Sequence, residues 1–290
     1  MCIIIIFALK TVMNELEKML ASLERSQQNR QRKNENSNQL ANGDELHQIS
    51  DNTVTKSNAL ARAYYRFGLV EKRIMEALIS KLHPLRTDNN TQLIELSAVE
   101  YGDAFNVPRQ VAYRDMAKAV DNLIGTVIRT EESNGVSKIV KFTLMTRAEY
   151  VESKGLISCK FNPDILPHLL GLREKFRSYP LKKAVNFQSS YTWRFYEILV
   201  SWAQPKNQTQ GRFAGWIKHQ SVDELREMLG VPKSYRWGDF QRQVLDVIAK
   251  ELKEKAQVAL FIDRVKTSRK ITHLDIRFIE DDQLKIQLKN

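Results

Sequence analysis

The hydrophobic pattern of residues 221–255 predicts two helices separated by a turn. Apolar residues of the first helix repeat at spacings of three and four, the period of one helix face, at Val222, Leu225 and Leu229. Ser221, with Glu224 three residues later, has the capping-box pattern of a helix start. Gly230 and Pro232 predict its end. Asp239 is the expected N-cap of the second helix, whose inward side comprises Phe240, Val244, Ile248 and Leu252.

Polar residues occupy the other side of this second helix. They lie on or near the face opposite the apolar one, at Arg242, Asp246, Lys250 and Lys253. A short helix, a tight turn and a longer helix with a polar outer face form the helix-turn-helix layout, in which the second helix enters the DNA major groove. Many helix pairs with a Gly-Val-Pro turn bind nothing, so this segment alone leaves a purely structural helix pair open.

An alternating pattern then predicts a β-hairpin. Residues 257–262 form the first expected strand and residues 271–278 the second, with a polar, basic turn at residues 267–270. A helix-turn-helix followed by a hairpin with a basic tip is the winged-helix arrangement. The wing normally reaches the DNA backbone, and the residues suited to that contact are Arg264, Lys266, Arg269 and Lys270.

The first half of the chain predicts the same order of elements. The expected elements are a helix over 59–82 broken near Gly68, a strand over 92–96, helices over 99–105 and 109–124, strands over 126–129 and 137–143 around a turn at 131–135, and a strand over 156–161. The string Phe105-Asn106-Val107-Pro108 resembles Leu229-Gly230-Val231-Pro232, at the same place in this order. We interpret the chain as an internal duplication of one winged-helix unit.

Two further helices are expected between these units. The first is a leucine-rich helix over residues 163–176, a candidate for sharing between two chains. The second covers residues 190–203, with its core side at Tyr191, Phe195, Ile198, Leu199 and Trp202. Trp193 and Tyr196 are candidates for base stacking, but core packing is the favoured interpretation.

The N-terminal extension has little capacity for a core. A short heptad seam, too brief to hold a coiled coil alone, contains Leu9, Met13, Leu16, Leu20 and Leu23. Residues 27–52 are rich in Asn, Gln, Ser, Arg and Glu and are predicted to be a linker without fixed structure. The apolar run Cys2–Leu9 is too short to span a bilayer and lacks the features of a signal peptide, and Met13 is an alternative start.

The composition narrows the class of molecule that the protein is expected to bind. The 290 residues have a net charge of +11 and a pI near 9.5, which favours nucleic acid first and an acidic membrane surface second. The two cysteines, Cys2 and Cys159, lie far apart, so we expect neither a disulfide framework nor a zinc cluster, and a reducing cytosol.

The motifs of common enzymes are absent from the sequence. It contains no Gly-x-x-x-x-Gly-Lys-Ser/Thr loop, no His-Glu-x-x-His and no Cys-x-x-Cys. Tyr64 and Tyr65 are similar to the nucleophilic tyrosines of rolling-circle nickases, but the histidine pair that such enzymes need is missing. We expect no enzyme, no cofactor and no metal. The alternatives are a dimeric winged-helix transcriptional repressor and, third, a membrane-surface protein.

Four strings then indicate a family. They are Ser57–Leu60 (SNAL), Phe176–Leu181 (FRSYPL), Ser190–Leu199 (SYTWRFYEIL) and Trp237–Leu245 (WGDFQRQVL). With them the chain resembles, over residues 57–278, the iteron-binding replication initiators of theta-replicating plasmids, the RepA/RepE/π type. The family often has a run of arginines in its second recognition helix, whereas here Arg242 stands between Gln241 and Gln243.

The resemblance implies two winged-helix domains that both contact double-stranded DNA. In the family the monomer binds iterons in the plasmid origin, helps to melt the origin, and recruits the host initiator DnaA and the replicative helicase. The dimer, formed through the first domain, binds an inverted-repeat operator and represses its own gene.

We therefore predict an α+β chain of two tandem winged-helix domains that controls plasmid replication and copy number in the bacterial cytoplasm. Residues 1–56 are the largely disordered extension, residues 57–185 the domain for dimerisation and DNA contact, and residues 186–290 the domain for main iteron recognition. The expected DNA-binding residues are Arg109, Tyr113, Arg114 and Lys118 in the first domain, and Lys233, Arg236, Gln241, Arg242, Lys250, Arg264, Lys266, Arg269 and Lys270 in the second.

Overall fold

A strand near the start of the described chain pairs with one far along the sequence. The computed structural model describes residues 48–82, 93–133, 137–204 and 213–280. Strand β1 (Thr53–Ser57), which follows the 3-10 helix Ile49–Asp51, runs antiparallel to β7 (Phe176–Pro180). This pairing places residues 53–57, where the first winged-helix unit begins, beside residues 176–180, near its end.

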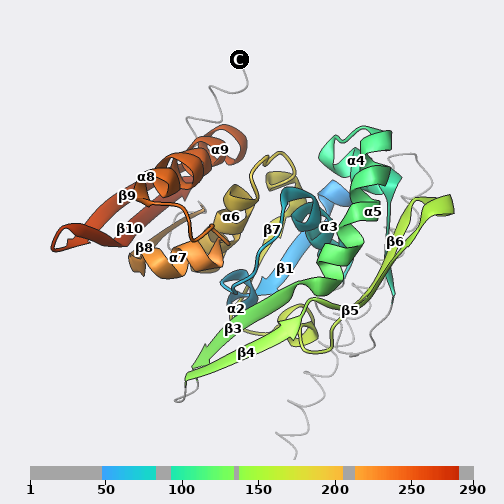
Figure 1. Ribbon diagram of the computed structural model, residues 1–290, viewed down its shortest axis with the longest axis horizontal. Coiled ribbons are helices and arrows are strands. Elements are labelled where there is room, and N and C mark those ends of the chain that lie inside the picture. Colours follow the sequence, from blue (N-terminus) through green and yellow to red (C-terminus); the bar gives the residue numbers. More distant parts are fainter. Residues whose placement is uncertain (1–47, 83–92, 134–136, 205–212, 281–290) are drawn as a thin grey trace, which may run out of the picture. The chain divides into compact units, whose positions relative to one another are not determined.

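Three helices form the centre of this first unit. Helices α3 (Leu69–Ser80), α4 (Ala98–Phe105) and α5 (Arg109–Gly125) pack against one another (Figure 1). The side chains of Ser97 and Glu100 form a capping box at the start of α4, and Asn106 ends it in the left-handed conformation. A helix-turn-helix therefore lies at α4 and α5, as the sequence predicts.

Two more antiparallel sheets belong to this unit. Strand β6 (Leu156–Phe161) lies between β2 (Ile94–Ser97) and β5 (Met145–Val151), and α5 packs on β5 and β6. Strands β3 (Val127–Ser133) and β4 (Ser137–Thr143) form a separate hairpin. Helix α6 (Ser190–Trp202) follows β7 and the 3-10 helix Leu181–Lys183.

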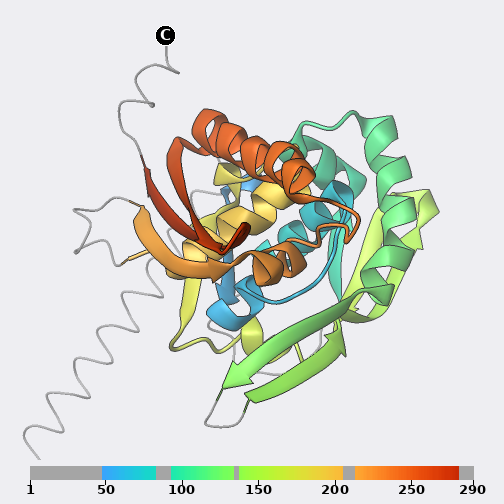
Figure 2. The same cartoon turned by 60° about the vertical axis from the view of Figure 1, so that its left-hand side comes forward.

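The second unit is a winged helix. Its elements are β8 (Ala214–Ser221), α7 (Val222–Met228), α8 (Trp237–Phe240), a π-helical turn (Gln241–Leu245), α9 (Asp246–Ala256), β9 (Val258–Thr267) and β10 (Lys270–Glu280). Strand β10 lies between β8 and β9. Leu274, Ile276 and Phe278 alternate along β10 and are buried with the inward residues expected for the second helix. Figure 2 shows α9 running along this sheet.

Several expected elements differ from those observed. The helix predicted over residues 59–82, with a break near Gly68, is α2 (Asn58–Ala61) and α3. Gly68 is the N-cap of α3, which confirms the break, but the gap begins earlier because Tyr64 forms backbone hydrogen bonds to Arg129 of β3. The leucine-rich helix is wrong: only residues 166–168 form a 3-10 turn, Gly171 has a φ of 63°, and residues 176–180 are β7. Its leucines at 166, 169 and 172 are buried in this chain's own core, so they are not free for sharing.

The start of the ordered chain and two strands also differ. The linker was expected to reach residue 52, within an extension that reaches residue 56. This end is wrong, because Ile49 is buried and residues 53–57 form the paired strand β1. The heptad seam and the apolar start lie outside the described residues. Strands β5 and β8 were not predicted. Trp193 and Tyr196 are buried, which confirms core packing.

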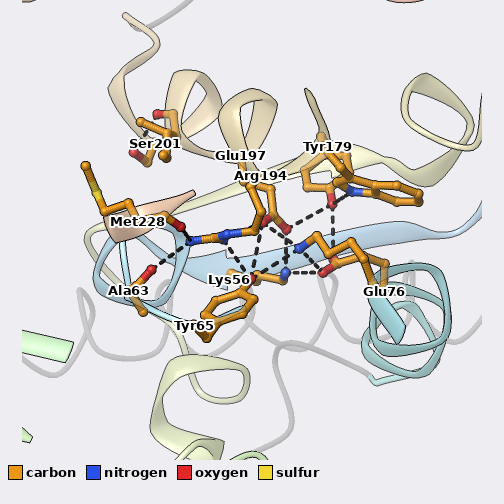
Figure 3. Close-up of polar contacts among 12 residues, drawn as sticks. Lys56, Ala63, Tyr65, Glu76, Tyr179, Arg194, Glu197, Ser201 and Met228 are labelled. Atoms are coloured by element: carbon orange, nitrogen blue, oxygen red, sulfur yellow. Dashed lines mark hydrogen bonds and ion pairs between the residues drawn. The ribbon is translucent and has the colours of Figure 1, made fainter. Parts of the chain in front are cut away.

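A buried ionic cluster joins the first unit to helix α6 (Figure 3). Lys56 of β1 lies 2.5 Å from carboxylate oxygens of both Glu76 and Glu197. Lys72 lies 2.6 Å from the same two carboxylates, and Arg194 lies 2.7 Å from Glu197. All five side chains are at most 4% exposed. Buried charges are tolerated only when paired, so these contacts hold β1, α3 and α6 in one arrangement.

Neutral side chains complete the cluster. The Tyr179 hydroxyl donates to Glu76 at 3.1 Å and accepts from the Trp193 indole at 3.0 Å. Arg194 also donates to the backbone carbonyl of Ala63 at 2.7 Å and that of Met228, at the end of α7, at 3.5 Å. The cluster therefore reaches from the β1–β7 pair to the second unit's first helix.

Replacing Glu197 with glutamine should lower the free energy of unfolding by about 3–5 kcal/mol, because three buried cations would then share one carboxylate. Urea denaturation followed by circular dichroism measures this loss. Glu254→Gln, on the exposed side of α9, removes the same charge and should change stability by less than about 0.5 kcal/mol. Equal effects of the two substitutions would contradict a stabilising role for the cluster.

Stability should also fall in acid because of Glu197. Burial opposes its charged form, but Lys56, Lys72 and Arg194 together lower the pKa of Glu197 well below its ordinary value. A lowered folded-state pKa adds stability above the unfolded-state pKa of about 4.3, and this contribution is lost as pH falls toward the folded-state pKa. Urea midpoints measured from pH 7 to pH 3 should therefore decline more steeply in wild type than in Glu197→Gln. Parallel curves would exclude this carboxylate as the cause.

Candidate nucleic-acid interface

The second unit's helix-turn-helix is built around a turn that only glycine fits. Gly230, after α7, has a φ of 69°, a conformation that L side chains rarely adopt. A Cβ added there would also lie 3.0 Å from Cγ of Arg66, in the loop before α3. The second helix begins at Trp237 rather than at Asp239. The Asp239 carboxylate instead accepts the N–H of Arg236 at 3.3 Å, as a residue in the first turn does.

Arginine and glutamine side chains are exposed in the first turns of this helix. Arg242 is 75% exposed and pairs with Asp239 at 3.3 Å. Gln243 donates to the same carboxylate at 3.4 Å. Both carboxylate contacts are within the helix and on the surface, where such pairs are weak. The guanidinium is therefore available to a stronger partner, such as the edge of a guanine.

A π-helical turn, Gln241–Leu245, interrupts the helix at this place. Such turns are rare in proteins, and many of them lie at functional sites. Here the turn brings Gln241 beside Asp246, and the glutamine amide nitrogen donates to the carboxylate at 2.5 Å. The amide oxygen of Gln241 accepts from Arg264 of strand β9 at 3.2 Å. This chain of contacts links the recognition helix to the wing.

The wing is a long hairpin with a basic tip. Thr267 pairs with Lys270, so Ser268 and Arg269 form a two-residue turn, with Ser268 at a φ of 57°. Arg264, Lys266, Arg269 and Lys270 are all exposed. The guanidinium of Arg264 lies 5.6 Å from the Trp237 ring, at the start of the recognition helix. The predicted wing residues therefore share one hairpin, and Arg264 alone among them contacts the helix residues predicted for DNA.

The remaining predicted residues lie on the turn and on two helices. Lys233 and Arg236 are exposed in the turn before the recognition helix, and Lys250 is exposed on α9. In the first unit Arg109, Arg114 and Lys118 are exposed on α5, and Arg114 pairs with Asp115 at 3.1 Å.

Tyr113 of α5 has a packing role in this structure. Its ring is partly buried and lies against Gly155, where an added Cβ would come within 2.2 Å of the ring carbon Cε1. Gly155 also has a φ of 55°. The tyrosine ring therefore needs a glycine at this position, whatever its hydroxyl contacts.

Two acidic residues of this surface, Asp239 and Asp246, are not among the predicted DNA-binding residues. They hold the polar side chains of the recognition helix in place. The pairing of Gln241 with Asp246 depends on the π-helical turn, which the 3.6-residue period of an α-helix does not indicate. The pairing of Arg242 with Asp239 had a signal, the three-residue spacing of opposite charges on a helix.

Tyr65 and Cys159, the residues with side chains that could react, are buried in the core. Tyr65 is buried against the ionic cluster, and burial raises its pKa far above the usual value. Burial also raises the pKa of the Cys159 thiol to about 12, which suppresses the reactive thiolate. Within the described residues no group of three His, Cys, Asp or Glu side chains is placed to hold a metal ion. No helix in those same residues is long and apolar enough to cross a membrane.

Comparisons with known proteins agree with this geometry. The fold of the Pi initiator protein, in a crystal structure of its complex with iteron DNA, matches with a TM-score of 0.62 at 20% identity, over 80% of this chain and 99% of that one. An Escherichia coli protein described as an uncharacterized 27.6 kDa protein is 22% identical over 212 residues, 70% of this chain and 85% of that protein.

Two family models match the two units in order. The model for the initiator replication protein WH1 domain matches residues 53–200, and the model for the initiator Rep protein WH2 domain matches residues 221–278. Helix α6, which the sequence analysis placed in the second domain, lies mostly within the first range. Because the matches cover more than half of the chain, the protein belongs to the family of replication initiators with tandem WH1 and WH2 winged-helix domains.

Proposed function

We propose that this protein initiates plasmid replication by binding iteron DNA through the recognition helix of its second domain. The observation that carries the proposal is a helix, 237–256, with an exposed polar face, beside a hairpin with a basic tip. That combination reads base edges with the helix and contacts phosphates with the wing. The net charge of +11 and the likeness to the Pi initiator protein, solved on iteron DNA, support it.

The proposed action has two forms in the bacterial cytoplasm. The monomer binds the origin iterons with both domains, helps to melt the origin, and recruits DnaA and the replicative helicase. The dimer forms through the first domain and represses the protein's own gene at an inverted repeat. The exposed Arg109, Arg114 and Lys118 of α5 support DNA contact by the first domain.

Footprinting of the purified protein on DNA flanking its own gene separates an initiator from a plain transcriptional repressor. An initiator should protect several direct repeats spaced by about one or two helical turns. A repressor should protect an inverted repeat alone. Protection of a single inverted repeat, with no direct repeats at any protein concentration, would overturn the proposed initiator role.

Arg242→Ala and Lys270→Ala should separate base reading from phosphate contact. Loss of a bidentate arginine contact should cost about 1–3 kcal/mol on the matched site and relax the preference at one base pair. Loss of the wing lysine should weaken all DNA sequences alike and reduce the salt slope by about one. Titration of iteron and scrambled DNA at several salt concentrations measures both effects.

Two results would contradict base reading by Arg242. If Arg242→Ala weakens both DNAs equally, Arg242 contacts phosphate. If affinity is unchanged and only helix stability falls, by about 0.2–0.5 kcal/mol, the arginine does no more than pair with Asp239 on its own helix.

Dimerisation should depend on the β3–β4 hairpin of the first domain. Val127 and Ile139 are 52% and 60% exposed, and the strand register places them on the same face of the hairpin. Ile139→Asp should therefore weaken the dimer, measured by sedimentation over a range of protein concentrations. Phe261→Asp, at a 52% exposed aromatic of the second domain, is the matched control and should leave the dimer intact. The reverse pattern would place the interface in the second domain.

A further inference from the structure

The amide of Gln241 is held on both sides by charged neighbours. Its nitrogen donates to Asp246 at 2.5 Å, and its oxygen accepts from Arg264 at 3.2 Å. A carboxylate only accepts hydrogen bonds and a guanidinium only donates them. The two neighbours therefore fix which end of the amide is nitrogen and which is oxygen.

The π-helical turn makes this arrangement possible. In an α-helix, side chains five residues apart point about 140° away from each other, because each residue turns by about 100°. Within the turn Gln241–Leu245 the backbone closes over five residues instead, and residues 241 and 246 become neighbours. The carboxylate is thus placed beside the glutamine by the backbone itself.

The clamped amide keeps one donor and one acceptor free. An amide has two N–H groups and an oxygen with two lone pairs, and one of each is used by Asp246 and Arg264. In the major groove adenine offers an acceptor at N7 beside a donor at N6, which matches the free pair. Guanine offers two acceptors and leaves the amide oxygen without a donor.

We propose that Gln241 reads an adenine of the iteron and that Asp246 is the positioning residue that fixes the orientation of its amide. This inference rests on the proposed function, in which the recognition helix enters the major groove. The negative charge of Asp246 weakens binding to the phosphates of every sequence. Asp246 strengthens binding only at the base pair that Gln241 contacts. The residue therefore raises specificity while it lowers the affinity for DNA in general.

The test uses the full chain and the footprinted site, with each A·T pair changed in turn to G·C. Wild type should lose affinity about 5- to 150-fold at one A·T pair read by Gln241. Asp246→Asn, whose amide also donates, should lose most of that discrimination at this pair and keep it elsewhere. Gln241→Ala should lose it completely, and the double variant should be no worse than Gln241→Ala. Asp246→Glu, which keeps a carboxylate, should retain discrimination.

Glu254→Gln is the matched control, because it removes one exposed negative charge from the same helix. It should change the affinity for all sequences alike. If Asp246→Asn behaves like this control, or if Gln241→Ala discriminates as wild type does, the inference is overturned. Wild type that binds scrambled DNA as tightly as the site would instead refute the proposed function. Circular dichroism of each variant confirms that it is folded. If Asp246→Asn is not folded, Gln241→Ala decides the result, because retained discrimination in that variant overturns the inference.

Discussion

The arrangement of the first domain depends on two buried carboxylates that share three buried cations. Glu76 and Glu197 come from helices more than 100 residues apart in sequence, and Lys56 and Lys72 each contact both of them. Removing either carboxylate would leave three buried cations to share the other one. Strand β1, helix α3 and helix α6 are thus fixed relative to one another by electrostatics as well as by apolar packing.

The contrast between this cluster and the recognition helix explains how a basic protein uses its charges. One group of cations, Lys56, Lys72 and Arg194, forms buried ion pairs inside the protein. Arg242 and the wing residues instead lie on the surface, and the ion pair of Arg242 with Asp239 is weak. Only the second group is available to a polyanion. A sequence with a net charge of +11 does not reveal this division, because both groups contain the same residue types.

The elements that sequence predicted well have strong local signals. The turn at Gly230, the apolar period from Phe240 to Leu252 and the basic hairpin turn are all set by neighbours in the chain. Strand β8 was missed because Ile217 is its single buried residue, and the leucine-rich segment was misassigned because its apolar residues fit a helical period until Gly171 breaks it. For the candidate DNA-binding site, the sequence predicted the second helix of the helix-turn-helix and the hairpin that follows it. The contacts of Gln241 with Asp246 and Arg264 depend on backbone geometry and on a second strand, and neither is visible in a one-dimensional period.

The π-helical turn also bears on how such proteins diverge. A π turn contains one residue more than an α turn, so losing a single codon within residues 241–245 would return this stretch to an uninterrupted α-helix. The residues before the deletion would keep their orientation relative to α9, because the π turn already accommodates the extra residue within one turn. After loss of one residue between them, Gln241 and Asp246 would stand four residues apart, the spacing at which side chains on an α-helix are neighbours. Deletion of Arg242 or Gln243 would thus remove one exposed side chain from this helix and leave the contact between Gln241 and Asp246 in place.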